Sequence, residues 1–169
     1  MAIDIQRTSP NFADGLGYST VFGHMDNERV VIEASSGGEN ENINHTQDDV
    51  LKLIKTLTSI VILKAYQLKN ARFETFKKYK AISIQVIKRK LTLSVLSMAP
   101  SKKFVFNERR SATIPITYYE RYDWLQVFEL LAEFEVGTQD TVMYTTYVYN
   151  DDHRHAMANK LLIFAATFR

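Results

Sequence analysis

Hydrophobic and polar residues alternate near the start of the chain in a way that predicts a β-hairpin. Segment 18–22 is short and β-prone, and segment 29–33 contains three consecutive β-branched residues. Asp26-Asn27 lies between them and is typical of a tight turn. The polar, glycine-containing segment 35–42 then predicts a loop.

A long amphipathic helix is predicted after this loop. Thr46-Gln47-Asp48-Asp49 has the form of a capping box, with an acid three residues after a hydroxyl. Hydrophobic residues recur behind it at helical spacing, namely Val50, Leu53, Ile54, Leu57, Ile60 and Val61. We expect this helix to end near Lys69.

Strand patterns dominate the middle of the chain. Residues 82–86 and 91–95 alternate between hydrophobic and polar positions, and the charged Lys88-Arg89-Lys90 between them predicts a hairpin connection. Segments 104–106 and 112–116 are further predicted strands, and Pro115 marks a sheet edge or a strand end. Strands combined with a long helix predict an α/β fold.

The last third of the chain divides into two patterns. Thr117-Tyr118-Tyr119-Glu120 is a second capping box, and it opens a helix whose predicted core stripe is Trp124, Leu125, Phe128, Leu131 and Ala132. Beyond Gly137, residues 142–149 are strand-like and 156–168 favour a short final helix. We therefore expect an α/β domain at residues 1–136 and a C-terminal strand–helix extension at residues 137–169.

Composition narrows the class of protein. A chain of 169 residues is long enough for one domain with a sizeable core. The absence of cysteine excludes a disulfide scaffold, a cysteine nucleophile and a thiolate metal site, and it favours a reducing compartment. No secretory signal and no apolar stretch of membrane-spanning length is visible. We expect a soluble protein of the cytoplasm or nucleus that does not enter a membrane.

Charge is segregated along the chain although the net charge is only +2. Residues 52–121 contain 16 Lys and Arg against three acids, whereas both flanking segments are acidic. One interpretation is a nucleic-acid-binding surface, with these candidate residues: Lys88, Arg89, Lys90, Lys102, Lys103, Arg109 and Arg110. Tyr118, Tyr119, Tyr122 and Trp124 are candidates to stack on bases. The alternative is that lysines solvate outer faces and that the acids pair with the basic residues in the fold.

Two acids of the predicted hairpin are candidate ligands for a hard cation. Asp14 precedes the first strand and Glu33 ends the second. Hydrolysis of a phosphodiester usually needs a divalent metal that activates water, and Mg²⁺ prefers carboxylate oxygens. The alternative is that Asp14 is an ordinary turn residue beside Gly15 and that Glu33 pairs with a basic neighbour.

The same residues carry a resemblance to a known family. Ala13-Asp14-Gly15 followed by Ile32-Glu33-Ala34-Ser35 resembles the motif hairpin of the PD-(D/E)XK nuclease superfamily. Residues 13–135 are similar, through segments 73–78 and 110–115, to poorly characterised nuclease-like proteins of early-diverging fungi. The resemblance implies a restriction-endonuclease-like core, with a mixed sheet flanked by helices, in which Asp14 and Glu33 bind Mg²⁺ or Mn²⁺.

The sequence departs from this family pattern in three places. Ser35 occupies the position of the catalytic lysine, so Lys52 or Lys55 of the following helix are the candidates to replace it. No helix is indicated upstream of Asp14, which predicts a core shortened on that side, and the segment after Gly137 has no recognised counterpart. We expect a nuclease-fold domain that binds nucleic acid, either as a weak metal-dependent hydrolase or as an inactive member. The alternatives are a non-catalytic nucleic-acid or protein interaction module and a homo-oligomeric structural protein.

Overall fold

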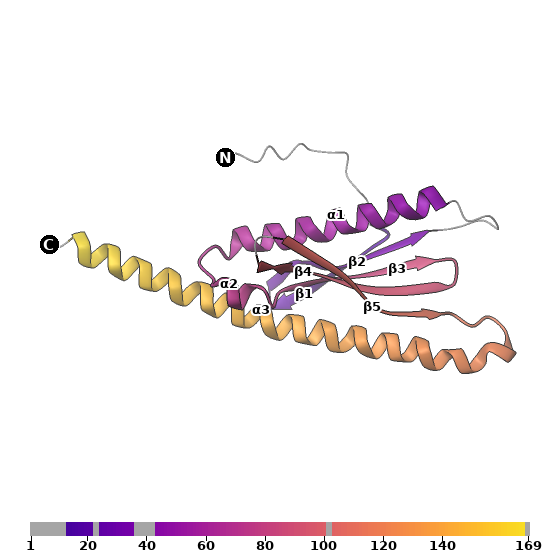
Figure 1. Ribbon diagram of the computed structural model, residues 1–169. Coiled ribbons are helices and arrows are strands. Elements are labelled where there is room, and N and C mark those ends of the chain that lie inside the picture. Colours follow the sequence, from indigo (N-terminus) through magenta and orange to yellow (C-terminus); the bar gives the residue numbers. More distant parts are fainter. Residues whose placement is uncertain (1–12, 22–23, 36–42, 101–102, 168–169) are drawn as a thin grey trace.

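A computed structural model of the chain describes residues 13–21, 24–35, 43–100 and 103–167 (Figure 1). Within these residues the fold is built on one five-stranded sheet with helices on both of its faces. The elements are, in chain order, β1 (Gly15–Val21), β2 (His24–Ser35), α1 (Ile43–Gln67), α2 (Phe73–Phe76), β3 (Lys80–Ile87), β4 (Lys90–Ala99), β5 (Lys103–Thr113), the 3₁₀-helix η2 (Tyr118–Asp123) and α3 (Trp124–Thr167).

The strands lie in the sheet in sequence order, β1-β2-β3-β4-β5. Only β2 and β3 are parallel, and the three other pairs are antiparallel. Parallel neighbours need a crossover connection, and α1 supplies most of it. The prediction of an α/β fold with a mixed sheet flanked by helices is therefore confirmed.

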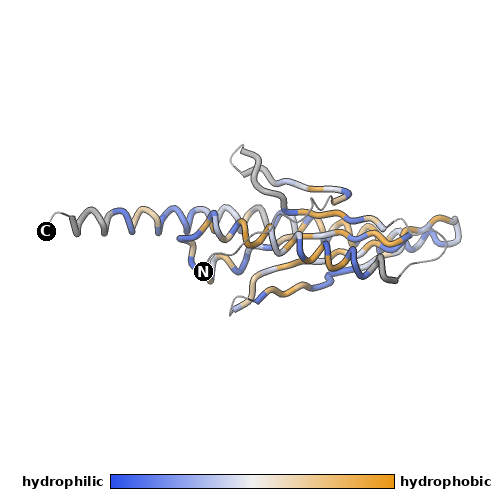
Figure 2. Tube along the Cα trace, turned by 90° about the horizontal axis from the view of Figure 1, so that it is seen from above, coloured by the Kyte–Doolittle hydropathy of each residue, from blue (hydrophilic) through white to orange (hydrophobic). Residues whose placement is uncertain are grey.

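Each face of the sheet has its own hydrophobic core, because successive side chains of a strand point to opposite faces. Val31, Ala81 and Leu96 belong to the core under α1, which also contains Leu53, Leu57 and Val61 of that helix. Val30, Ile82 and Leu93 belong to the core under the first part of α3. In Figure 2 the hydrophobic residues, drawn in orange, are frequent along the strands of the sheet.

The predicted β1–β2 hairpin is confirmed, but the predicted position of its turn is wrong. Asp26 and Asn27 lie inside β2, so the connection falls at residues 22–23, outside the described residues. Gly17 allows the two strands to approach closely, since a Cβ atom there would lie 2.8 Å from the Val30 Cβ. The register shifts immediately after Gly17, so the regular pairing of the two strands is interrupted there.

Three other predicted boundaries also differ from the structure. Segments 104–106 and 112–116 are not two strands, because β5 runs without interruption from Lys103 to Thr113. The α1 helix begins at Ile43, so Thr46 lies within the helix and is not its N-cap. The second predicted capping box is present, since Glu120 accepts a hydrogen bond from the Thr117 backbone, although it opens a 3₁₀-helix before α3 begins.

The predicted strand at residues 142–149 is wrong. These residues belong to α3, which is a single helix of 44 residues that also crosses the expected boundary at residues 136 and 137. Thr145, Val148 and Asp151 are buried at three-residue spacing, a helical periodicity that β-prone valine and tyrosine residues had hidden. The C-terminal part of α3 projects beyond the end of the sheet (Figure 1).

The predicted core stripe of this helix is also wrong. Val127 and Leu130 are buried against the sheet, with Phe134 packed beside them. Leu125, Phe128 and Leu131 are exposed instead. The sequence pattern could not distinguish the two faces because both carry large hydrophobic side chains.

Candidate functional site

The hairpin brings Asp14 next to Glu33. Gly15 pairs with Ile32, so Asp14 lies one position further, opposite Glu33 across the two strands. The Ala34 backbone N–H donates a hydrogen bond of 2.7 Å to Asp14 Oδ2, which holds this exposed carboxylate at the end of β2. The structure thus places together the two acids that the sequence indicated.

Glu33 is the buried member of the pair, with only 3% of its surface exposed. Its Oε2 lies 3.3 Å from Lys52 Nζ, and this ion pair connects β2 to α1. Lys55 lies nearly one turn further along α1 and is exposed. Of the two lysines considered as replacements for the motif lysine, Lys52 is therefore the one that contacts Glu33.

Ser35, at the motif position for lysine, contacts an acid of α1. Its hydroxyl donates a hydrogen bond to Asp49 Oδ2. Asp49 and Lys52 are three residues apart and thus on one face of the helix, toward the end of β2. From the sequence, Asp49 was predicted only to belong to a helix cap. Its spacing of three residues from Lys52 places both on one face of the helix, and this was the available signal that Asp49 lies near the same site as Lys52.

Polar side chains continue from Glu33 onto the neighbouring strands. Gln85 is the Cα partner of Glu33 in the parallel β2–β3 pair, so both side chains point to the α1 face of the sheet. Ser83 and its partner Ser94 on β4 lie on the same face and are buried. In the sequence, these residues were recognisable only as the polar positions of alternating strand patterns.

Several atoms of this polar row have no hydrogen-bond partner within the described part of the chain. They are Glu33 Oε1, Gln85 Nε2 and Ser83 Oγ, all of them buried. Buried polar atoms in native proteins are nearly always paired, and a row of unpaired ones indicates a place for a bound water, ion or ligand. This observation, and not the acid pair alone, distinguishes the site from an ordinary surface.

The surroundings of Glu33 make its carboxyl easier to protonate than that of an ordinary glutamate. Burial raises the pKa of the Glu33 carboxyl above its usual value, and the charges of Asp14 and Asp49 raise it further. The hydrogen bond and the charge of Lys52 lower this pKa and partly offset that rise. A cation beside the three carboxylates would favour the ionised form in the same way as Lys52 does.

The side chains present fit a small divalent cation only in part. No group of three His, Cys, Asp or Glu residues in the described ranges is close enough to hold a metal ion. Mg²⁺ is commonly bound by one or two carboxylates, with waters and substrate oxygens completing its coordination. Asp14 and the free Oε1 of Glu33 match that smaller ligand set.

The site also lies where open α/β sheets usually bind ligands. Glu33 and Gln85 are near the C-terminal ends of the two parallel strands, on the face covered by the first half of α1. Ligands of such sheets bind outside the carboxyl ends of parallel strands.

The turn between β3 and β4 brings basic residues to this same end of the sheet. Ser35 pairs with Ile87, and Lys88 and Lys90 follow directly with exposed side chains. Lys88 has a φ angle of 54°, in the left-handed region that tight hairpin turns use. Lys103 is exposed at the start of β5, but it pairs with Ala99 at the opposite end of the sheet. Lys102 lies outside the described residues.

The remaining basic candidates are held in ion pairs. Arg109 and Arg110 on β5 contact Glu133 and Glu129 of α3, and Arg89 contacts Glu120 of η2 at 2.9 Å. The basic middle of the chain is therefore partly neutralised by acids from its C-terminal segment. These ion pairs explain the presence of Arg89, Arg109 and Arg110 without nucleic acid.

Aromatic side chains are exposed on η2, beside the β3–β4 turn. Tyr118, Tyr119 and Tyr122 are largely in solvent, Tyr119 being 90% exposed. Arg121 lies over the rings of Tyr118 and Tyr122, at 4.2 Å and 4.5 Å from their centroids. The Arg89–Glu120 ion pair fixes this cluster to the turn that carries Lys88 and Lys90.

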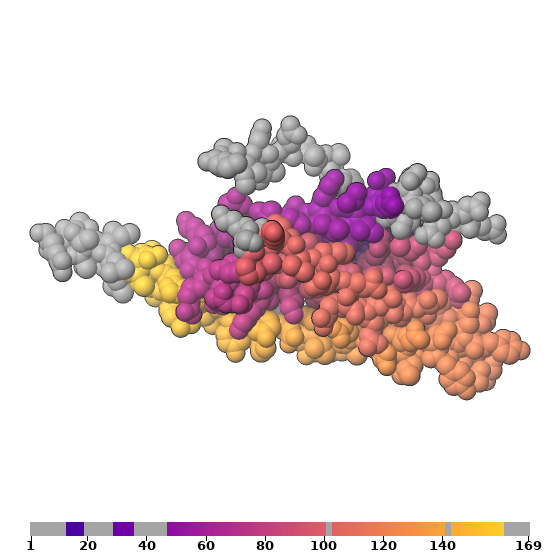
Figure 3. Space-filling model, in the orientation of Figure 1, coloured from indigo at the N-terminus to yellow at the C-terminus, as the bar shows by residue number. Residues whose placement is uncertain are grey.

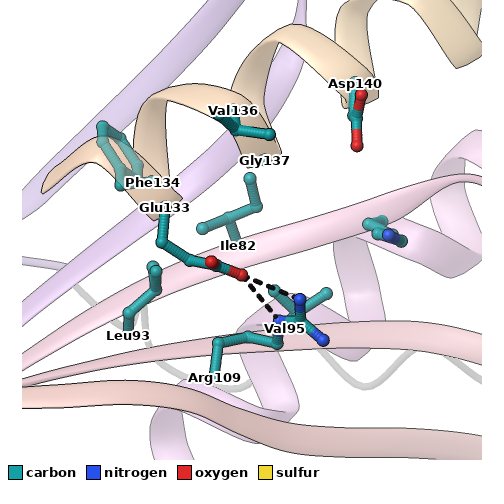
Figure 4. A pocket seen from close by; sticks show the side chains of 10 residues that line it. Ile82, Leu93, Val95, Arg109, Glu133, Phe134, Val136, Gly137 and Asp140 are labelled. Carbon is teal, nitrogen blue, oxygen red and sulfur yellow. Dashed lines mark hydrogen bonds and ion pairs between the residues drawn. The ribbon is translucent and has the colours of Figure 1, made fainter. Parts of the chain in front are cut away.

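A small pocket of about 70 Å³ lies on the other face of the sheet, between α3 and strands β3 to β5 (Figure 4). Its wall combines Ile82, Phe134 and Gly137 with the Arg109–Glu133 ion pair, in which two guanidinium nitrogens contact one carboxylate oxygen. Arg109 and Glu133 satisfy each other here, so this pocket lacks the unpaired buried polar atoms found around Glu33.

Comparison of the chain with protein-family models, with curated proteins and with solved structures found no match. Among the described residues, no helix combines the length and the apolar character that crossing a bilayer would require.

Proposed function

We propose that this chain is a divalent-metal-dependent phosphodiester hydrolase that acts on nucleic acid. Asp14 and Glu33 are its metal ligands, and Lys52 takes the part of the lysine that is absent at Ser35. The observation that carries the proposal is the buried Glu33 carboxylate, which has one oxygen on Lys52 and the other without a partner among the described residues.

Each residue has a separate task in this proposal. When bound, Mg²⁺ or Mn²⁺ activates water and shields the phosphate charge. Lys52 favours the ionised form of the buried Glu33, and in this proposal its ammonium group stabilises negative charge that develops on the phosphate. Asp49 holds Ser35 and with it the end of β2, and the Gln85 amide has a free donor for a bound water.

The substrate surface in this proposal is the end of the sheet that carries the β3–β4 turn and η2. Lys88 and Lys90 provide positive charge for phosphates, and the exposed tyrosines provide rings on which unstacked bases can lie. We leave Arg109 and Arg110 out of this surface because α3 already neutralises them.

The test is cleavage of single-stranded and double-stranded DNA and RNA in Mg²⁺ or Mn²⁺, with EDTA as the blank. We expect Asp14→Asn to reduce cleavage by about 100-fold or more, since it removes one of two protein ligands. Glu108→Gln is the matched control, because this exposed carboxylate lies on β5, away from the acid pair. Mn²⁺ binding measured by calorimetry should weaken in Asp14→Asn and not in Glu108→Gln.

Absence of cleavage by the unmodified chain, together with Mn²⁺ binding that both variants share, would overturn the proposal. Thermal unfolding of both variants separates a lost ligand from a lost fold. Asp14 is exposed, so its substitution should leave the melting temperature almost unchanged.

A non-catalytic nucleic-acid-binding module is the second candidate, and the exposed tyrosines of η2 favour it. It predicts salt-dependent binding that survives Asp14→Asn. Lys88→Gln with Lys90→Gln should weaken this binding and reduce the slope of log affinity against log salt by about two. Arg89 is kept in this test because it holds η2 through Glu120.

A further inference from the structure

The carboxamide of Gln85 is a buried polar group on the α1 side of the sheet. Gln85 is 8% exposed, and its Nε2 has no hydrogen-bond partner among the described residues. A buried donor in this situation is costly unless a bound molecule accepts its hydrogen bond. In Figure 3 the side chains of α1, drawn in purple and magenta, lie along one long side of the molecule, and those of α3, drawn in orange to yellow, lie along the other.

Gln85 and Glu33 are direct neighbours in the sheet. They are Cα partners in the parallel pair of β2 and β3, on strands about 4.8 Å apart, and their side chains point to the same face. Both side chains have two methylene groups before a planar head group, so the carboxamide and the carboxylate have the same reach. Glu33 Oε1 is also buried and has no partner among the described residues. A donor and an acceptor at neighbouring positions therefore do not bond to each other.

The charges around these two atoms limit what can connect them. An anion would be repelled by the Glu33 carboxylate and by Asp14 and Asp49, whose charges act on the same group. A cation between the two atoms would face the N–H hydrogens of Gln85, which carry partial positive charge. A neutral molecule that accepts one hydrogen bond and donates another satisfies both atoms. Water is the smallest such molecule.

Ser83 provides a further polar atom on the same face. It lies two positions before Gln85 on β3, is completely buried, and its Oγ has no partner among the described residues. Buried waters typically make about three hydrogen bonds to polar groups that the protein leaves unpaired. Glu33, Gln85 and Ser83 together offer that number.

We propose that a water molecule bridges Gln85 Nε2 and Glu33 Oε1, and that Gln85 is thereby a positioning residue for the Glu33 carboxylate. Glu33 lies between Asp14 on the β1 side and Gln85 on the β3 side. A carboxylate oxygen has more than one lone pair, so the same group can accept this water and bind a cation together with Asp14. The role of Gln85 toward the cation rests on the proposed function, in which Glu33 is a metal ligand, whereas the water bridge does not.

The first test detects the water directly, through nuclear Overhauser effects between water and the side-chain amide protons of the unmodified chain. The Gln85 amide should show the sign of effect that a long-lived bound water gives. The exposed amide of Gln126 on α3 should show only the effect of short-lived surface water. Gln85→Met assigns the signal, because it removes this amide at nearly the same side-chain length. An effect at Gln85 like that at Gln126 would overturn the bridge.

The second test measures Mn²⁺ affinity by calorimetry. Gln85→Met should weaken binding by about tenfold, as is typical of groups that orient a metal ligand. Thr92→Val is the matched control, since Thr92 is the partner of Gln85 on β4 and shares its face without adjoining Glu33. This control should leave the affinity unchanged. Equal affinity of Gln85→Met and the unmodified chain, or equal weakening by the control, would refute the positioning role.

Two outcomes separate this water bridge from the proposed function. An unmodified chain that does not bind Mn²⁺ would refute metal ligation by Glu33 and the positioning role with it, while the water signal at Gln85 would still decide the bridge. Mn²⁺ binding without a water signal at Gln85 would refute the bridge and leave the proposed function intact.

Discussion

Glu33 and Asp151 are two carboxylates that are equally buried but differ in how completely they are hydrogen-bonded. Each has 3% of its surface exposed. Glu33 lies beneath the first half of α1, has an unpaired oxygen, and its pKa is raised by burial. Asp151 lies at the other end of α1, and hydrogen bonds hold its pKa below the usual value, first of all the bond from the Arg72 backbone.

The partners explain this difference. Asp151 Oδ2 accepts the Arg72 backbone N–H at 2.9 Å, and its Oδ1 lies 3.2 Å from an Arg72 guanidinium nitrogen. Asp152 accepts the Asn70 backbone N–H at 2.6 Å, so both acids fasten the loop after α1 to α3. Burial alone therefore does not identify a functional acid. The distinguishing feature is whether the protein itself completes the hydrogen bonds of the buried group.

The largest expected effect concerns activity. Glu33→Gln should reduce metal-dependent cleavage by about 1,000-fold, equivalent to about 4 kcal/mol, because it removes the buried anionic ligand. The same substitution should leave the free energy of unfolding unchanged or raise it, since it removes a poorly solvated charge. Initial cleavage rates and chemical denaturation measure the two quantities. Full activity, or a clearly less stable variant, would contradict the assignment of Glu33.

Asp151→Ala should have the opposite profile. Its loss leaves the Arg72 N–H without its acceptor and should lower the free energy of unfolding by about 2–3 kcal/mol. Cleavage per folded molecule should stay the same, because the loop lies at the far end of α1. Urea denaturation gives the stability, and Glu135→Gln serves as an exposed control on the same helix. A free energy of unfolding equal to that of the control would contradict the structural role assigned to Asp151.

Lys52→Met should have an intermediate effect that depends on pH. Without the ammonium group, the Glu33 pKa rises further, and ionised Glu33 costs about 1–2 kcal/mol of stability at neutral pH. This loss should disappear as the pH falls through the raised pKa, because protonated Glu33 has no charge to bury. Denaturation at several pH values provides the measurement. A loss that is independent of pH would indicate a packing defect instead.

The smallest expected effect is seen in the unmodified chain, where Asp151 and Glu33 should change stability in opposite directions as the pH falls. The contribution of Asp151 is present at neutral pH and is lost as the pH falls through its lowered pKa. Glu33 has the opposite sign, since its raised pKa favours the folded state as the pH decreases toward acidic values. Amide hydrogen exchange should be measured at neutral and acidic pH. As the pH falls, residues 70–72 should lose their protection against exchange at a higher pH than α1 residues 49–52. The reverse order would contradict both assignments.

The sequence was most informative where hydrophobic and polar residues follow one regular period. The helix at α1 and the alternating strands β3 and β4 follow directly from their periodicity, and the β1–β2 hairpin made the proximity of Asp14 and Glu33 predictable. The α3 helix was not predictable in the same way. Its two hydrophobic faces obscured the periodicity, and β-branched residues after Gly137 favoured a strand that tertiary packing overrides.

The polar row around Glu33 depends on contacts between distant segments. Gln85 and Glu33 meet only through the parallel register of β2 and β3, which no local pattern encodes. Asp49 meets Ser35 only because α1 returns over the end of β2. The roles of Asp14, Glu33 and Lys52 in binding and catalysis remain predictions.

The parallel pairing of β2 and β3 also has a consequence for folding. Val30 and Ile82 are partners although they are 52 positions apart in the chain, whereas the β3–β4 hairpin closes across a two-residue turn. Closing a long loop costs more entropy than closing a short one, so contacts between distant segments form slowly. We therefore expect the hairpin of β3 and β4 to form early during refolding. The surroundings of Glu33, assembled from β1, β2, α1 and β3, should be completed last.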